Sequence, residues 1–301
     1  MNVGKIHPMV KQLLDSWRAS NTSITHWFDF LGDEMPFTVI KGTLRPDLGR
    51  PDGDSMRFVP DDATPIFKLR RRGRAPKING SNGSIQLRYE GIDTMESSAL
   101  QPYSSDATTA NVSEAASDGG RGYICSNQLG PNGRPIAFVF TGETDWEDGR
   151  DDIFLGPDDI MESINVKQLA SGHAYPLFYD TLFDDLRERC AEVSQQAKDA
   201  SLAVWAADET NSGATWTGDV DTLAPIYPKL WRRIDKFVRD DTFFDEDKPL
   251  ANLTKWMEQE AFERVSVPSQ GMFTGFDNLI TVTDDTVKME VEPHEVVVIS
   301  K

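Results

Sequence analysis

The sequence predicts an α+β fold. Short strand-like segments come first and helical segments follow them, an order typical of α+β domains and not of alternating βαβ units. The chain has 301 residues, of which 39% are hydrophobic and 27% charged, so it can bury a sizeable core. No apolar run approaches the about 20 residues that a membrane span needs. We therefore expect a globular protein with no membrane partner.

The expected elements follow in order as far as Trp205. Apolar residues at helical spacing, among them Leu13 and Trp17, predict an amphipathic helix over 7–19, and a second helix is expected over 23–32. Strand-like runs lie at 37–41, 55–59, 66–70, the start of 83–96, 122–126 and 136–140. The segment 97–121 is rich in Ser, Ala, Thr and Asp, which predicts at most a short helix near 108–117. Helical spacing returns over 158–172 and 179–203.

The composition changes after Trp205. The segment 208–215 (DETNSGAT) is a linker by composition. Helices are expected over 225–239 and 249–264. An antiparallel meander is then expected from strands at 279–283, 287–291 and 296–300.

The charge balance is strongly acidic, with a net charge of −18 and a pI near 4.6. This argues against a protein that coats nucleic acid without specificity. One basic run stands out: Lys68, Arg70, Arg71, Arg72, Arg74 and Lys77. The run is either a solvated hairpin tip that pairs with the protein's own acidic loops or an arm that contacts phosphates. Exposed charges are screened beyond about 8 Å at physiological salt, so a local patch governs its own contacts.

Several classes of chemistry are excluded by missing patterns. Cys125 and Cys190 make no disulfide framework, and we expect free buried thiols in a cytoplasmic protein. The start of the chain lacks a secretory signal pattern. The four histidines are scattered, and no zinc spacing, P-loop, dinucleotide glycine pattern or nucleophile elbow occurs. Carboxylates and arginines remain as the candidates for chemistry.

Three segments supply these side chains. The turn Asp52–Ser55 carries Asp54, with Gly53 allowing a tight turn, and a second turn at 132–135 carries Arg134. The stretch between them, GSIQLRYEGIDTME at 83–96, supplies the rest: Arg88, Asp93, Thr94 and Glu96. Carboxylate and carbonyl oxygens suit a hard cation such as Ca²⁺, and planar guanidinium groups suit phosphate oxygens. The inventory matches metal-assisted hydrolysis of a phosphodiester.

Five blocks in order give a resemblance to a known family. DGDSMRF, LRYEGIDTME, NGRPIAFVF, NVKQLASGHAY and QQAKDASLAVW resemble the staphylococcal-nuclease-like (thermonuclease) family over roughly 36–209. The resemblance implies a five-stranded OB-type barrel capped by helices over 36–209. The helical segment expected at 1–35 and the C-terminal α+β region expected at 210–301 lie outside the resemblance. The resemblance also implies a Ca²⁺-dependent nuclease, with Mg²⁺ or Mn²⁺ as alternatives, that cleaves DNA or RNA and leaves 3′-phosphates.

The resemblance also assigns roles to residues. It places the metal on Asp54, Asp93 and the backbone carbonyl of Thr94. It makes Arg88 and Arg134 the phosphate-binding arginines. It makes Glu96 the base that orients or deprotonates water.

The sequence departs from the family pattern at several points. Met95 stands where the family has proline, and Pro131 and Asn132 replace the usual Lys and Tyr before the Gly-Arg turn. The segment before Gly133 lacks a convincing long first helix, and the basic run lies in an apparent insertion at 60–80. The aromatic residue that stacks near a base could be any of three: Tyr175, Phe178 or Tyr179.

Strand geometry adds one further prediction. Arg88 and Asp93 are five residues apart, so a regular strand would place them on opposite faces. They converge only where the strand bends or bulges, and Gly91 between them is the expected place.

Two other functions stay open. The chain could be a catalytically inactive nuclease-like module that binds nucleic acid or protein, or a scaffold that binds a protein partner or itself through its C-terminal region. The helix expected over 225–239 carries five basic residues beside its apolar face: Lys229, Arg232, Arg233, Lys236 and Arg239. They form a solvated face beside acidic loops, a second nucleic-acid contact or a docking surface. Control of the nuclease by the C-terminal region is a further hypothesis.

Overall fold

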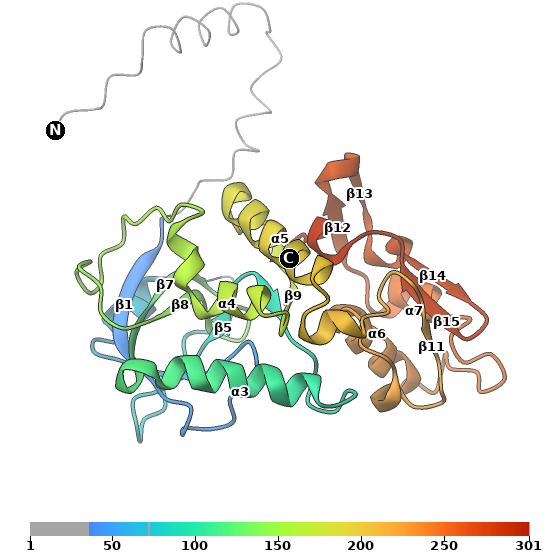
Figure 1. Cartoon of the computed structure of the whole chain (residues 1–301), viewed down its shortest axis with the longest axis horizontal. Coiled ribbons are helices and arrows are strands. Elements are labelled where there is room, and N and C mark those ends of the chain that lie inside the picture. The colour runs from blue at the N-terminus through green and yellow to red at the C-terminus, as the bar shows by residue number, and fades with distance from the viewer. Residues whose placement is uncertain (1–35, 72, 301) are drawn as a thin grey trace, which may run out of the picture. The chain divides into compact units, whose positions relative to one another are not determined.

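The computed structural model describes residues 36–71 and 73–300, which belong to one compact unit (Figure 1). The helices expected over 7–19 and 23–32, and the basic residue Arg72, lie outside the described residues. No helix within the described ranges is long and apolar enough to cross a membrane.

The largest sheet is barrel-like and nearly closed. Its strands are β1 (Thr38–Leu44), β2 (Arg57–Pro60), β3 (Arg70–Arg71), β4 (Ile85–Gln86), β5 (Arg88–Tyr89), β7 (Arg121–Leu129) and β8 (Pro135–Thr141). The path runs β4-β2-β1-β7-β8-β5, and β3 pairs in parallel with β7. Only Leu87 separates β4 from β5, so one segment pairs with β2 at one end of the path and with β8 at the other. This segment therefore brings the two ends of the path together.

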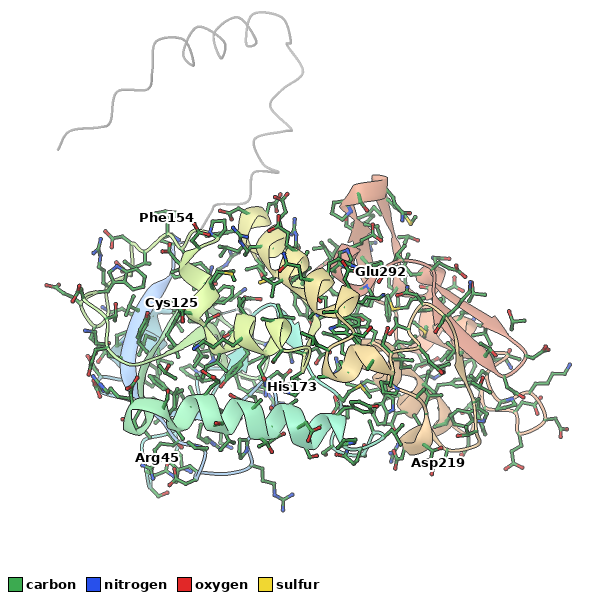
Figure 2. The ribbon with its side chains drawn as sticks, in the orientation of Figure 1. Arg45, Cys125, Phe154, His173, Asp219 and Glu292 are labelled. Carbon is green, nitrogen blue, oxygen red and sulfur yellow. The ribbon has the colours of Figure 1, made fainter. Side chains whose placement is uncertain are left out.

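The interior of this sheet is apolar. Phe37, Ile40, Phe58, Ile124 and Phe138 are buried to 2% exposure or less. The predicted strands at 37–41, 55–59, 122–126 and 136–140 are confirmed, with longer boundaries in most cases. Both cysteines are free and buried, as expected, and Cys125 lies in the barrel strand β7 (Figure 2).

Three longer helices pack on the barrel: α3 (Tyr103–Ala116), α4 (Ile164–Ala170) and α5 (Asp184–Asp199). The helices expected over 158–172 and 179–203 are confirmed in shorter form. The expectation of at most a short helix near 108–117 was wrong, because α3 has 14 residues. Its buried face is made of small and polar residues (Ser104, Ala107, Asn111, Ala115), so it shows no apolar periodicity.

A fourth helix replaces a predicted strand. The strand expected at 66–70 was wrong, because the chain forms the short helix α2 (Thr64–Lys68) and then the two-residue strand β3. Pro65 lies in the first turn of α2, where its fixed φ and missing N–H are favourable. The side chain of Asp62 accepts a hydrogen bond from the Thr64 backbone N–H at 2.8 Å. These start signals outweigh the β-propensity of Ile66 and Phe67.

The rest of the chain builds two helices and two further sheets. The helices are α6 (Pro228–Val238) and α7 (Leu253–Glu260). One sheet has the order β11 (Ala214–Thr215), β15 (Thr286–Met289), β14 (Ile280–Thr283). The other has the order β10 (Phe178–Tyr179), β16 (Val297–Val298), β12 (Arg264–Val267), β13 (Met272–Gly275). A separate pair joins β6 (Ile92–Asp93) to β9 (Tyr175–Pro176).

Short 3-10 turns connect elements throughout the described chain. They lie at Ser117–Gly120, Asp159–Glu162, Ala203–Ala206, Val220–Thr222, Pro268–Gln270, Phe276–Leu279 and Pro293–Glu295.

The meander expected at the C-terminus is only partly right. The strands near 279–283 and 287–291 pair antiparallel, as predicted. The third strand leaves the meander, since β16 pairs in parallel with β10 and antiparallel with β12. A short apolar run does not specify its pairing partner, so the sequence pattern could not show this.

The expected linker at 208–215 is an ordered connection instead. The side chain of Asn211 donates hydrogen bonds to the carbonyls of Met289 and Val291, and β11 pairs with β15. Lys198 on α5 donates to the Asn211 side chain and forms an ion pair with Glu292. The polar residues of the segment are therefore used as hydrogen-bonding groups within the fold.

A second hydrophobic cluster spans this part of the chain. It contains Leu230, Trp231 and Ile234 of α6, together with Met95 and Tyr175 from beside the barrel. Met95 comes directly after the predicted ligands Asp93 and Thr94. The cluster therefore fixes α6 next to the segment that carries them, and Figure 1 shows α6 near β9.

A buried acid gives the fold a predicted pH dependence. Glu90 is 4% exposed; burial raises its pKa from 4.5 to about 7, although the Gly91 N–H and Arg88 oppose this rise. The folded state keeps a proton that the unfolded state loses, so stability falls as pH rises between about 4.5 and 7, by up to about 3 kcal/mol. Urea unfolding at about pH 5 and about pH 8 should show this loss for the wild type and a flatter profile for Glu90→Gln. Equal slopes for the two proteins would contradict the assignment.

Candidate active site

The loop that carries Asp54 is held by two cap helices. Asn111 on α3 donates from its side-chain amide to the Asp52 carbonyl at 2.6 Å. Gln168 on α4 donates to the Gly53 carbonyl at 2.8 Å. Both amides are buried, and buried polar groups hold their partners firmly when they are satisfied. The position of Asp54 is thus set by α3 and α4 as well as by the barrel.

Gly53 brings this loop against the second predicted segment. A Cβ atom placed on Gly53 would lie 2.6 Å from Thr94 Cγ2 and 2.8 Å from Ala107 Cβ, so only glycine allows the contact. The sequence suggested a tight turn as the role of Gly53, but Gly53 is not among the positive-φ glycines. Its role is close packing, which places Asp54 beside the segment Asp93–Thr94.

This close contact predicts the effect of one methyl group. We expect Gly53→Ala to lower the free energy of unfolding by about 1–3 kcal/mol, because the loop and Thr94 must move apart. The matched control is Gly80→Ala, since a Cβ at Gly80 would meet nothing within 4 Å. Chemical unfolding of the two variants measures the difference. Equal stabilities for the two variants would show that the contact is not tight.

The predicted distortion at Gly91 is confirmed. β5 ends at Tyr89, and Gly91 has a φ of +76°, which favours glycine. The chain then forms β6, which pairs with β9 in a different sheet from β5. The turn at Glu90–Gly91 thus separates the two strands, and it lets Arg88 and Asp93 serve the same site.

Electrostatic coupling shows that three segments converge. Burial lowers the pKa of Arg88, but the charges of Asp54 and Asp93 outweigh burial and raise it overall. Burial, followed by the negative charges of Asp52 and Asp93, raises the pKa of Asp54 well above its usual value, with Arg88 opposing. Burial and the positive charge of Arg88 lower the pKa of Arg134. Backbone contacts agree: the Tyr89 N–H donates to the Asp54 carbonyl at 2.9 Å, and Arg88 pairs with Ile136, two residues after Arg134. Asp54, Arg88, Asp93 and Arg134 therefore lie close together.

The two predicted phosphate arginines lie near carboxylates but are not in direct contact with them. Within residues 36–71 and 73–300, neither Arg88 nor Arg134 has an ion pair or side-chain hydrogen bond. Arg134 leaves a tight turn in which Gly133 has a φ of +76° and donates to the Gly130 carbonyl at 2.8 Å. Two neighbouring guanidinium groups repel each other, and an anion between them would relieve the repulsion.

Asp93 and Glu96 are both hydrogen-bonded to Arg232, which lies outside the part of the chain that resembles the nuclease family. Arg232 of α6 donates from Nη1 and Nη2 to the two carboxylate oxygens of Asp93, at 3.0 and 2.5 Å. Its Nη1 also donates to Glu96 Oε1 at 2.9 Å. Burial lowers the pKa of Arg232, but the charges and hydrogen bonds of Asp93 and Glu96 raise it overall. One guanidinium therefore holds a predicted metal ligand and the predicted base together.

This arrangement does not fit a metal ion. Both oxygens of Asp93 are hydrogen-bonded to Arg232, so Asp54 and the Thr94 carbonyl remain as predicted ligands without their shared partner. In the part of the chain that the structure describes, no group of three or more His, Cys, Asp or Glu side chains is placed to hold a metal. A cation could use the predicted set only after Arg232 moved.

The three aromatic residues that could stack near a base have different surroundings. Tyr175 is buried and donates to Asp208, and Phe178 lies in the barrel core. Tyr179 is half-buried, and the charges of Arg88 and Asp93 affect its pKa, which burial raises. Of the three, Tyr179 is therefore the candidate that lies nearest the predicted site residues and is not fully buried.

The basic run lies beside the turn of Arg134. Arg70 and Arg71 form β3 on the end of β7, and the Arg74 N–H donates to the Pro131 carbonyl at 3.1 Å. A Cβ on Gly133 would lie 2.2 Å from the Ala75 carbonyl. The exposed cations of the run are Lys68, Arg70, Arg71, Arg74 and Lys77. None of these five joins an ion pair with another described residue. The run thus lies beside the turn that carries Arg134, and its exposed cations are open to solvent or to a partner.

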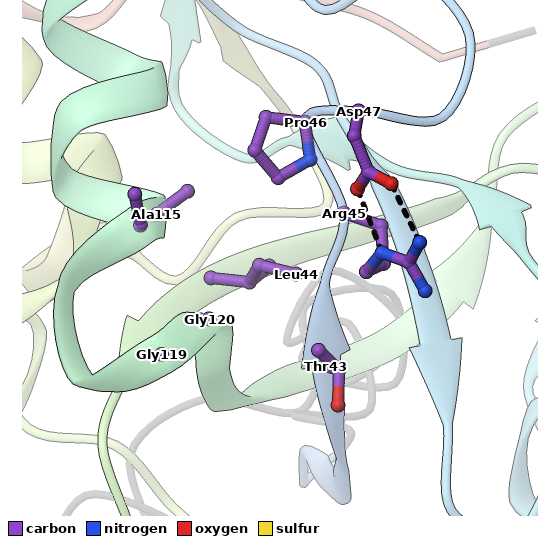
Figure 3. A pocket seen from close by; sticks show the side chains of 9 residues that line it. Thr43, Leu44, Arg45, Pro46, Asp47, Ala115, Gly119 and Gly120 are labelled. Carbon is purple, nitrogen blue, oxygen red and sulfur yellow. Dashed lines mark hydrogen bonds and ion pairs between the residues drawn. The ribbon is translucent and has the colours of Figure 1, made fainter.

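A separate small hollow lies away from these residues. It is lined by the end of β1, the end of α3 and the segment 45–47 (Figure 3). Arg45 and Asp47 in its wall neutralise each other through two hydrogen bonds. No predicted site residue lines the hollow, so it is not the candidate active site.

Sequence reasoning missed Arg232, Asn111 and Gln168. The basic face of the helix at 225–239 was visible, but not which acids its residues would meet.

The buried Tyr227 hydroxyl has no hydrogen-bond partner among the described residues. Burial raises its pKa, and the charges of Asp93 and Arg232 also act on it, so this hydroxyl belongs to the surroundings of the site.

Comparison with models of known protein families finds no match, and comparison with curated proteins finds none either. The fold and site define a mixed α+β protein with a nearly closed barrel-like sheet and a cluster of carboxylates and arginines beside it. The resemblance to a particular family therefore rests on the residues themselves.

Proposed function

We propose that the chain is a staphylococcal-nuclease-like phosphodiesterase that cleaves DNA or RNA and leaves 3′-phosphates. The observation that carries the proposal is the convergence of Asp54, Arg88, Asp93 and Arg134 from three separate segments. The nearly closed barrel-like sheet supports it, and under this proposal β1, β2, the segment 85–89, β7 and β8 would be the five strands of an OB-type barrel.

The unpaired arginines suit a phosphodiester. Arg88 and Arg134 present planar N–H groups that can bind non-bridging phosphate oxygens from two sides and stabilise the charge that develops during cleavage. The exposed basic run would extend this contact along the strand backbone, while the acidic remainder of the surface would not hold nucleic acid. Tyr179 is half-buried, and Lys229 Nζ lies 5.9 Å from its ring centroid, so a base would have to stack on the face of the ring that Lys229 does not cover.

Glu96 is the proposed base, and it is not available in the described arrangement. Its carboxylate accepts a hydrogen bond from Arg232, which lowers its ability to orient or deprotonate water. The reaction therefore requires Arg232 to move. Ca²⁺ is the proposed cation, with Mg²⁺ and Mn²⁺ as alternatives, on the residues that Arg232 would release.

The same ion pairs favour a second function. If Arg232 stays on Asp93 and Glu96 permanently, the chain is an inactive nuclease-like module that binds nucleic acid through Arg88, Arg134 and the basic run. Such a module would bind without cleaving, and metal would not affect its affinity.

End-labelled single-stranded DNA and RNA separate the two functions. The full chain is incubated with each strand in a Ca²⁺ series and in chelator, and products are treated with a phosphatase that removes 3′-phosphates. Metal-dependent cleavage and a phosphatase-sensitive mobility support the nuclease. Metal-independent binding without cleavage, in the wild type and in Arg232→Gln, supports the inactive module.

A further inference from the structure

The guanidinium of Arg232 takes the position of a cation between two acids. It forms a two-pronged pair with Asp93, and one of its nitrogens also reaches Glu96. We propose that Arg232 is an internal cation that closes the site and that a divalent metal ion binds only when this side chain swings away. The inference rests on the proposed function and adds its regulation.

The charges of the cluster support this role. Four carboxylates meet three guanidinium groups there: Asp52, Asp54, Asp93 and Glu96 with Arg88, Arg134 and Arg232. Without Arg232, the carboxylates of Asp52, Asp93 and Glu96 outnumber the two remaining guanidinium groups by one, and Asp54 makes the excess two when it is ionised. One divalent cation would balance that excess, so the metal and Arg232 are alternative partners for the same carboxylates.

The basic residues of α6 that form ion pairs have different partners, and among them Arg232 is the one that pairs with the acids of the candidate site. Lys229 and Arg233 bind the two oxygens of Glu263, each at 2.8 Å. Arg239 pairs with Asp235 on its own helix. Arg232, in contrast, reaches acids 139 and 136 residues away in sequence. The contact is therefore specific to one residue of α6.

The helix itself is fixed, so the moving part is the side chain. Leu230, Trp231 and Ile234 of α6 are buried in the second hydrophobic cluster, and the Trp231 indole N–H donates to the Val220 carbonyl at 3.0 Å. The Arg232 side chain is 29% exposed, whereas Asp93 is 4% exposed. A long side chain with an open side can turn toward solvent without unfolding its helix. Movement of the Arg232 side chain alone can therefore open or close the site.

The energetic consequence is a reduced apparent affinity for metal. A ligand that needs a minor conformation binds with its intrinsic dissociation constant divided by the population of that conformation. If Arg232 leaves its carboxylates in fewer than about a tenth of the molecules, removing it should tighten metal binding at least about tenfold.

The test measures metal binding directly, apart from cleavage. Ca²⁺ binding by calorimetry, supported by Tb³⁺ luminescence, is compared for the full-length wild type, Arg232→Gln and Arg233→Gln. Arg233→Gln is the matched control, since it removes the neighbouring arginine and its pair with Glu263 but leaves the site closed. Circular dichroism checks that each variant is folded. Arg232→Lys, which keeps a charge but cannot bridge both acids, is the second variant should Arg232→Gln not fold.

We expect Arg232→Gln to bind one Ca²⁺ at least about tenfold more tightly than the other two proteins, and Asp93→Asn in that background to abolish the gain. Arg232→Lys should lie between the wild type and Arg232→Gln. Equal Ca²⁺ affinity of folded wild type and folded Arg232 variants would overturn the inference. A gain in binding without cleavage leaves the inference standing and refutes the nuclease. Cleavage by the variants without a change in Ca²⁺ affinity would refute the inference and support the nuclease.

Discussion

Replacing Arg134 by alanine is expected to lower the rate of phosphodiester cleavage by about 10²–10³-fold, because it removes one fixed donor to developing charge. Arg134 is without an ion-pair partner among the described residues, so its removal strands no buried carboxylate and the fold should survive. The rate is measured in excess Ca²⁺ on the wild type and on Arg232→Gln, in which the site is open. Arg88→Ala should behave in the same way.

The matched control for this prediction is Arg74→Ala. Arg74 belongs to the exposed basic run beside the turn of Arg134 and carries the same charge. Its loss should raise KM and reduce the salt dependence of binding while leaving kcat nearly unchanged. Equal effects of the two substitutions on kcat would mean that Arg134 acts only through general charge.

Removing Arg232 is expected to destabilise the metal-free protein by about 3 kcal/mol, because the buried carboxylate of Asp93 loses its partner. Arg233→Gln should cost less, since Glu263 keeps its pair with Lys229. Chemical unfolding in chelator gives the two values. Saturating Ca²⁺ should then restabilise Arg232→Gln and leave Arg233→Gln almost unchanged.

Two results would speak against this assignment of Arg232. Equal stability losses in Arg232→Gln and Arg233→Gln would show that Asp93 does not depend on its ion pair. Failure of Ca²⁺ to restabilise a folded Arg232→Gln protein would show that the released carboxylates do not bind a cation.

The sequence was informative where local rules decide the structure. The five-residue spacing of Arg88 and Asp93 required a break in the strand, and Gly91 was the residue that could provide it. The Gly-Arg turn and the strand after it were visible for the same reason, as Gly133 adopts a positive φ immediately before β8. Short-range geometry thus shapes the turn in each of these two segments, whereas long-range contacts bring the site segments together.

The sequence was uninformative where contacts between residues far apart in the chain determine the structure of the site. Helix α3 buries Ser104, Ala107, Asn111 and Ala115. The side-chain amide of Asn111 donates to the carbonyl of Asp52, and sequence periodicity does not reveal this partner. Arg232 resembled the other basic residues of its helix. Only the tertiary structure shows that its partners are Asp93 and Glu96 and not Glu263.

The claim that these side chains form a nuclease site is tested most directly by the initial rate of cleavage of a labelled single-stranded DNA by Arg232→Gln in excess Ca²⁺. The comparison protein is Arg232→Gln with Asp93→Asn. Rapid cleavage by the single variant to 3′-phosphate ends, lost in the double variant, is the predicted result. An Arg232→Gln protein that is folded and binds both Ca²⁺ and DNA, yet leaves the strand intact, would contradict it.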